Sequence, residues 1–146
     1  MKRKLTWPIF WALVGVFIVV ACLFSIPAFR DLLRSPELFL APIAVFFLLG
    51  VALIFFTVKE KVRRIHKKLL LLTGASAVGF FVSILLHNAI YGLFIYWFGA
   101  DFWDRIGTGD EPFFFLVAII ICPIGFLVGV VSSIVLAFKS KSSIPN

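Results

Sequence analysis

The chain has 146 residues, of which 62% are hydrophobic and 14% are charged, and its formal net charge is +7. A soluble domain carries about 45–50% apolar and about 25% charged residues, so no small soluble core hides this much apolar surface. The composition excludes an ordinary soluble domain and indicates that lipid is the solvent. A charge of +7 also suits nucleic-acid binding, but these charges lie between apolar runs, so we expect no nucleic-acid partner.

Four uncharged runs divide the chain, at residues 5–29, 38–58, 69–100 and 112–138. Each is longer than the roughly 20 helical residues that cross about 30 Å of hydrocarbon. We therefore expect an all-α integral membrane protein with a single domain over residues 1–146. The expected transmembrane helices lie at about 6–29, 37–58, 68–98 and 112–138. Short connections favour an antiparallel up-down-up-down bundle.

The first run follows a basic start, as in a secretory signal peptide, and residues 19–22 (VVAC) resemble a bacterial lipobox. In that alternative the chain is cleaved before Cys22 and the cysteine is lipidated. Apolar sequence continues past Cys22 to Ile26, whereas a lipidated cysteine is usually followed by a polar tether. We favour an uncleaved first helix, and the lipidation of Cys22 stays open.

The connection at residues 59–68 is the most basic segment of the chain. Its six cationic residues are Lys59, Lys61, Arg63, Arg64, Lys67 and Lys68. Their first role is to fix the topology, and each cation near an anionic leaflet adds about 1 kcal/mol of attraction. We expect this loop to contact anionic lipid headgroups.

Small residues recur every four positions in the last two runs. They are Ala75, Gly79 and Ser83 in the third run and Gly125, Gly129 and Ser133 in the fourth. Helices in a membrane associate where small residues let the backbones approach. We expect the third and fourth helices to pack together along these residues.

The third run also carries polar side chains well inside its apolar sequence. Ser83, His87, Asn88 and Tyr91 form an expected polar site, about 16 Å from the end of the helix near Phe98. An ionisable group in a membrane is a candidate functional site. Interhelical hydrogen bonding is the favoured interpretation, and a ligand or proton site is the alternative. A metal held by His87, Cys22 and Cys122 is a third, but no CxxC motif supports it, and we expect no metal or cofactor.

The segment 99–111 mixes acids with aromatic residues and predicts a short interfacial helix whose aromatic face lies on the membrane. Thr108–Glu111 matches a capping box ahead of Pro112. Pro123 lacks a backbone N–H, so it should kink the fourth helix.

The orientation follows from the Lys and Arg residues. Eleven lie at the two termini and in the connection 59–68, and three (Arg30, Arg34, Arg105) lie in the other two connections. The positive-inside rule places the first set in the cytoplasm, so we expect both termini on the inner face of the cell membrane.

No nucleophile, base and orienting group occur together, so we lean against an enzyme. The sequence favours a non-enzymatic small multi-pass membrane protein, a subunit or scaffold that packs against membrane helices of another protein or of a second copy. The alternative is a small transporter or channel with a polar site around His87 and Asn88.

Overall fold

The structure, a computed structural model, describes residues 5–27 and 36–142, and this part of the chain is helical without any strand. The elements in order are α1 (Thr6–Ser25), α3 (Pro36–Lys59), α4 (Arg64–Phe98), α5 (Phe102–Arg105), α6 (Pro112–Leu116), the π-helical turn η2 (Val117–Ile121) and α7 (Cys122–Ser142). Because α6, η2 and α7 follow one another directly, they form one continuous helix.

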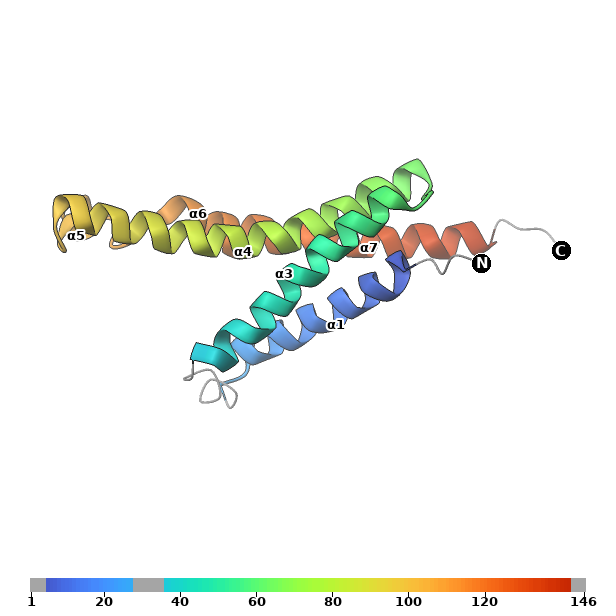
Figure 1. The fold of residues 1–146 in the computed structure, drawn as a ribbon, viewed down its shortest axis with the longest axis horizontal. Coiled ribbons are helices and arrows are strands. Elements are labelled where there is room, and N and C mark those ends of the chain that lie inside the picture. The colour runs from blue at the N-terminus through green and yellow to red at the C-terminus, as the bar shows by residue number, and fades with distance from the viewer. Residues whose placement is uncertain (1–4, 28–35, 143–146) are drawn as a thin grey trace.

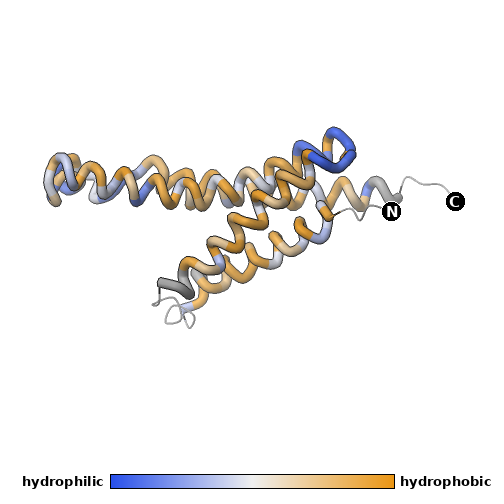
Figure 2. Tube along the Cα trace, in the orientation of Figure 1, coloured by the Kyte–Doolittle hydropathy of each residue, from blue (hydrophilic) through white to orange (hydrophobic). Residues whose placement is uncertain are grey.

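Within the described residues, four helical stretches are long and apolar enough to cross a membrane. They are Thr6–Leu23, Leu40–Lys59, Arg64–Phe98 and Pro112–Lys139. The expectation of an all-helical chain with four membrane-length helices is confirmed. Figure 2 shows that these helices are mainly apolar and that the most hydrophilic segment is the connection between α3 and α4.

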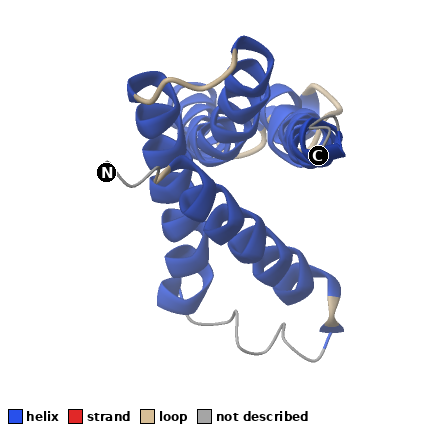
Figure 3. Cartoon of the chain, turned by 90° about the vertical axis from the view of Figure 1, so that its right-hand side faces the viewer, coloured by secondary structure: helices blue, strands red, loops and turns tan. Residues whose placement is uncertain are grey.

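Consecutive long helices run in opposite directions and form two hairpins, α1 with α3 and α4 with α6–α7 (Figure 1). The start of α1, the α3–α4 connection and the end of α7 lie at one end, which we call the basic end. The hairpins meet there and diverge away from it, so that α3 crosses α4 at an angle (Figures 1 and 3). The expected antiparallel up-down-up-down bundle is thus opened into two splayed hairpins.

Local sequence explains where the helices end. Helix α1 stops at Ser25, and Ile26 is extended (φ −94°, ψ 117°), because a residue before proline avoids the helical region. Helix α4 begins at Arg64, four residues earlier than expected, since Arg and Lys are good helix formers. The interruption expected at Pro123 occurs as the π-turn Val117–Ile121, which ends two residues before this proline.

A buried apolar cluster holds the two hairpins together near the crossing. Its fully or nearly fully buried members are Phe10, Leu13, Phe46, Leu53, Leu70, Ala77, Phe126 and Val130. The ring of Phe17 in α1 stacks on Phe126 in α7 with centroids 4.5 Å apart, so the first helix contacts the last. This cluster separates one cavity at the basic end from a second cavity between the diverging arms.

Candidate functional site

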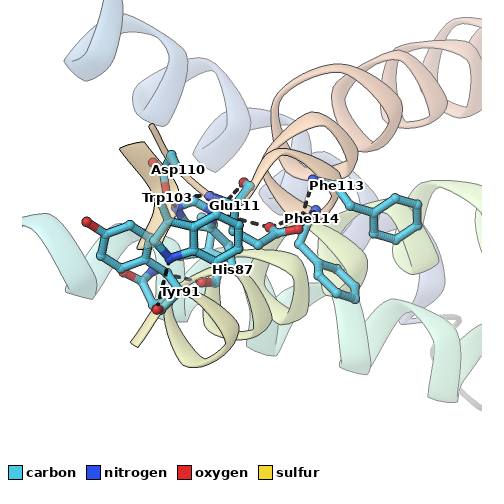
Figure 4. Close-up of polar contacts among 9 residues, drawn as sticks. His87, Tyr91, Trp103, Asp110, Glu111, Phe113 and Phe114 are labelled. Carbon is cyan, nitrogen blue, oxygen red and sulfur yellow. Dashed lines mark hydrogen bonds and ion pairs between the residues drawn. The ribbon is translucent and has the colours of Figure 1, made fainter. Parts of the chain in front are cut away.

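The polar site expected in the third run lies on the face of α4 that meets the start of α6 (Figure 4). Nδ1 of His87 is 3.1 Å from the main-chain oxygen of Glu111 and 3.3 Å from its Oε2. A carbonyl oxygen only accepts hydrogen bonds, so Nδ1 carries the proton and donates it to Glu111. Nε2 faces Oδ1 of Asp110 at 3.6 Å. His87 is therefore paired with residues of the connection 99–111.

This pairing places His87 beside the start of the fourth membrane-length helix. The connection folds back along the last turns of α4. Helix α4 therefore extends past the start of the fourth span by the eleven residues 88–98, or roughly 16 Å. The stretch from Leu69 to His87 already spans about 28 Å, close to the thickness of the hydrocarbon layer. His87 thus lies level with the first residue of the fourth span, and not in its middle.

Glu111 is the best-satisfied acid in the described part of the chain. Its side chain accepts hydrogen bonds from the backbone N–H groups of Phe113 (2.8 Å to Oε1) and Phe114 (3.0 Å to Oε2), and it is about 5% exposed. It is therefore the N-cap of α6. Its negative charge is also stabilised by the positive end of the helix dipole. The expected capping box with Thr108 as the cap is wrong.

Tyr91 and Trp103 extend this polar site towards α5. Nε1 of Trp103 donates to the main-chain oxygen of Tyr91 at 3.2 Å, and the two rings stack with centroids 5.8 Å apart and planes 9° apart. Trp103 is 6% exposed, so it packs on α4 and does not lie on the membrane as we expected for the aromatic face of this segment. The cause is the reversal of the chain at Gly99, whose φ of +97° suits glycine.

Ser83 and Asn88 complete the expected set but do not join the His87–Glu111 pair. Ser83 is buried in α4. Asn88 is exposed, and its Nδ2 donates to the carbonyl oxygen of Ile84 within the same helix at 2.8 Å. Asn88 and His87 both line the cavity between the diverging hairpins.

That cavity, which we call the inter-hairpin cavity, has a volume of about 610 Å³. Its walls come from all four long helices and are mostly apolar, with Phe17, Phe46, Phe80 and Phe126 among them. The polar groups around it are few, namely Ser25, Ser76, Asn88, His87 and Cys122. Its size lies within the range of about 300–1,000 Å³ that is typical of ligand sites.

The glycines expected at the helix contact lie between α4 and α7. A Cβ on Gly125 would lie 2.6 Å from Oγ of Ser76, and one on Gly129 would lie 3.0 Å from the backbone nitrogen of Thr73. A Cβ on Gly79 would lie 3.2 Å from Sγ of Cys122. These glycines serve contacts inside the chain and leave no small-residue face free on α7 at those positions.

Ser133 and Ala75 are the other members of the expected contact set that differ in burial. Ser133 is fully buried, and its hydroxyl has no hydrogen-bond partner. Ala75 is exposed, and its neighbours Gly74 and Ser76 occupy the contacting faces of α4. A step of four residues turns a helix by about 400°, so Ala75 is rotated by about 120° from His87 three steps later.

The crossing point of α3 and α4 was not predicted from the sequence. A Cβ on Gly50 would lie 2.9 Å from Cβ of Ala77 and 3.1 Å from the carbonyl oxygen of Gly74. A Cβ on Gly74 would lie 3.0 Å from the carbonyl oxygen of Gly50. The two glycines therefore let the backbones touch. Neither glycine has a small residue four positions before or after it, so the repeated spacing that marked the other contact is absent.

The cationic residues of the connection 59–68 have different surroundings. Nζ of Lys59 lies 4.6 Å from the centre of the Phe55 ring, a cation–π contact. Lys61 and Arg63 line the cavity at the basic end, and Arg64, Lys67 and Lys68 do not. Glu60 turns its carboxylate to α1, where it accepts from the backbone N–H of Leu5 and from Oγ1 of Thr6, both at 2.7 Å.

Neither cysteine forms a disulfide, and Cys22 is exposed whereas Cys122 is buried. In residues 5–27 and 36–142, no three His, Cys, Asp or Glu side chains lie close enough together to hold a metal ion. The hypothetical ligand set of His87, Cys22 and Cys122 is therefore not assembled.

Comparisons with protein-family models, with curated proteins and with solved structures found no match to this chain. The four apolar helices are compatible with a small multi-pass membrane protein. Any finer role has to be argued from the chain's own geometry.

Proposed function

We propose that this chain is a non-enzymatic subunit or scaffold of the cell membrane, which packs against membrane helices of another protein or of a second copy. Both termini and the connection 59–68 face the cytoplasm in this proposal, following the positive-inside rule. The observation that carries it is the packed cluster between the two cavities. The side chains of Leu13, Leu53 and Phe126 are buried there, so the described helices pack closely between the two cavities, which supports a packing role.

The polar site supports the same proposal. His87, Glu111 and Trp103 all use their polar atoms in bonds that hold α4, α5 and α6 together. Such bonds are worth about 0.6 kcal/mol on average between membrane helices, which suits a structural role. The place left for a partner is the apolar opening between the hairpins, where Ile119 and Phe115 face the inter-hairpin cavity.

Site-specific photocrosslinking in intact membranes tests this proposal. A photoreactive phenylalanine replaces Ile119, which lines the inter-hairpin cavity, or Val131, an equally exposed aliphatic residue of α7 outside it. We expect a discrete adduct with a second polypeptide from position 119 and no such adduct from position 131. Adducts with lipid alone at both positions would overturn the proposal.

A small transporter or channel is the second candidate, favoured by the approach of the inter-hairpin cavity to His87 and Asn88. This candidate predicts that the purified chain makes liposomes permeable to a small solute. It also predicts that Ala118→Phe, which fills the cavity from a buried position, abolishes that permeability. The subunit proposal predicts liposomes no more permeable than protein-free ones.

A further inference from the structure

The cavity at the basic end has a different chemistry from the inter-hairpin cavity. It measures about 580 Å³ and lies between α1, the α3–α4 connection and α7. Aromatic and aliphatic side chains form one part of its wall, namely Trp7, Trp11, Val62, Ile134, Ala137 and Phe138. Cationic and other polar groups form the rest of the wall. A site with one apolar and one polar wall suits an amphiphilic ligand.

His66 is the unusual residue of this cavity. It is about 9% exposed and lines the cavity, and its ring meets the edge of Trp7 with centroids 6.3 Å apart. Among the residues that the structure describes, no side chain or backbone group forms a hydrogen bond with the His66 ring. The ring of His66 is therefore available as a hydrogen-bonding group to a ligand in the cavity.

The charges around the cavity indicate the sign of that partner. Lys61 and Arg63 line it, and no carboxylate in the described ranges forms an ion pair with either. The one acid in the wall, Glu60, already accepts two hydrogen bonds from the first residues of α1. A phosphate group in the cavity would therefore meet Lys61, Arg63 and His66 as donors, and arginine suits the geometry of phosphate well.

We propose that this cavity binds the headgroup phosphate of an anionic phospholipid, with Arg63, Lys61 and His66 as its donors. The inference rests on the membrane-embedded state of the chain but not on which side faces the cytoplasm. Trp7 and Trp11 cover the start of the acyl chains, since tryptophan prefers the boundary between headgroups and hydrocarbon. Cationic pockets between membrane helices bind lipid headgroups for the same reason.

Spin-labelled lipids measure the preference directly. The purified full chain is placed in phosphatidylcholine bilayers with trace spin-labelled phosphatidylglycerol or phosphatidylcholine, and the motionally restricted fraction gives a relative association constant. We expect phosphatidylglycerol to be preferred. The double variant Lys61→Gln/Arg63→Gln should lower this preference by about five- to tenfold. An equal association of both lipids with the unmodified chain would overturn the proposal.

The variant Lys59→Gln/Arg64→Gln is the matched control, because it removes the same charge from the same connection outside the cavity. We expect it to lower the preference clearly less than the Lys61/Arg63 double variant does, because neither Lys59 nor Arg64 lines the cavity. An equal loss in both double variants would mean that the whole connection attracts lipid diffusely, and it would reject a defined site.

Two further experiments test whether the shape of the cavity matters apart from its charge, and whether the ligand is a lipid or a free phosphate. Ala137→Trp fills the cavity without changing its charge, whereas Val135→Trp adds the same bulk on an exposed face of α7. Only the first should abolish the preference, and no effect of it would overturn the proposal. Millimolar glycerol 3-phosphate should not displace the lipid. Full displacement would show that the site takes a soluble phosphate instead.

Discussion

The side chain of Glu111 links two helices, because it caps the first turn of α6 and lies 3.3 Å from Nδ1 of His87 in α4. The two residues are 24 positions apart, and both are largely buried, with side-chain exposures of 17% for His87 and 6% for Glu111. An imidazole in the apolar sequence of α4 is thus satisfied by a carboxylate from the next connection. The pair fixes the position of α4 along the helix axis relative to the start of α6.

Replacing Glu111 by alanine should destabilise the second hairpin. The variant loses the N-cap of α6 and leaves Nδ1 of His87 with fewer acceptors, which together should cost about 1–3 kcal/mol. Titration of the helical signal with a denaturing detergent measures the free energy of unfolding. Asp104→Ala is the control, because this acid is exposed, and it should change the stability by less than about 0.5 kcal/mol. Equal effects of both variants would contradict the linking role of Glu111.

Glycine at position 129 is required by the contact of α7 with α4. A Cβ at this position would lie 3.0 Å from the backbone nitrogen of Thr73 and 3.1 Å from the carbonyl oxygen of Leu69. Gly129→Ala therefore has to push the two backbones apart. We expect a loss of about 1–3 kcal/mol in the same titration.

Gly92→Ala provides the comparison within α4. No atom lies within 4 Å of a Cβ at this position, and alanine is the better helix former by about 1 kcal/mol. Its thermal midpoint should stay the same or rise. If Gly129→Ala were as well tolerated as Gly92→Ala, the close approach of α4 and α7 would be refuted.

Ser133 should tolerate the loss of its hydroxyl. The group is buried in α7 without a hydrogen-bond partner, and an unpaired buried hydroxyl costs about 1–3 kcal/mol. Ser133→Ala should therefore leave the stability unchanged or raise it by up to about 1 kcal/mol. Ser133→Leu, with a bulkier side chain, should lower it by overpacking. A clear loss in the alanine variant would show that the hydroxyl has a partner in the folded chain.

The number and length of the helices could be predicted because they depend only on local composition. An apolar run has to satisfy its backbone internally, so each long uncharged run becomes a helix, and Pro27 and Gly99 mark helix ends by their own backbone preferences. The contact between α4 and α7 could also be expected, since glycine at repeated positions has few other uses in a membrane helix.

The partner of His87 could not be predicted, because it depends on how the connection 99–111 folds. That connection folds back over α4 because the chain reverses at Gly99 and Trp103 packs on Tyr91. Neither Gly99 nor Trp103 predicts such a reversal by itself. The Gly50–Gly74 crossing was missed for a related reason, since it joins two isolated glycines of different runs. The divergence of the hairpins depends on the shape of the whole core.

The most direct test is to determine on which side of the membrane the connections 59–68 and 99–111 lie. Single cysteines replace Lys61 or Asp104 in a chain that carries Cys22→Ser and Cys122→Ala, and a membrane-impermeant maleimide is added to intact and to opened cells. We expect Lys61→Cys to react only after the cells are opened and Asp104→Cys to react in intact cells. Labelling of both positions from the same side would contradict a chain that crosses the membrane four times with its basic end in the cytoplasm.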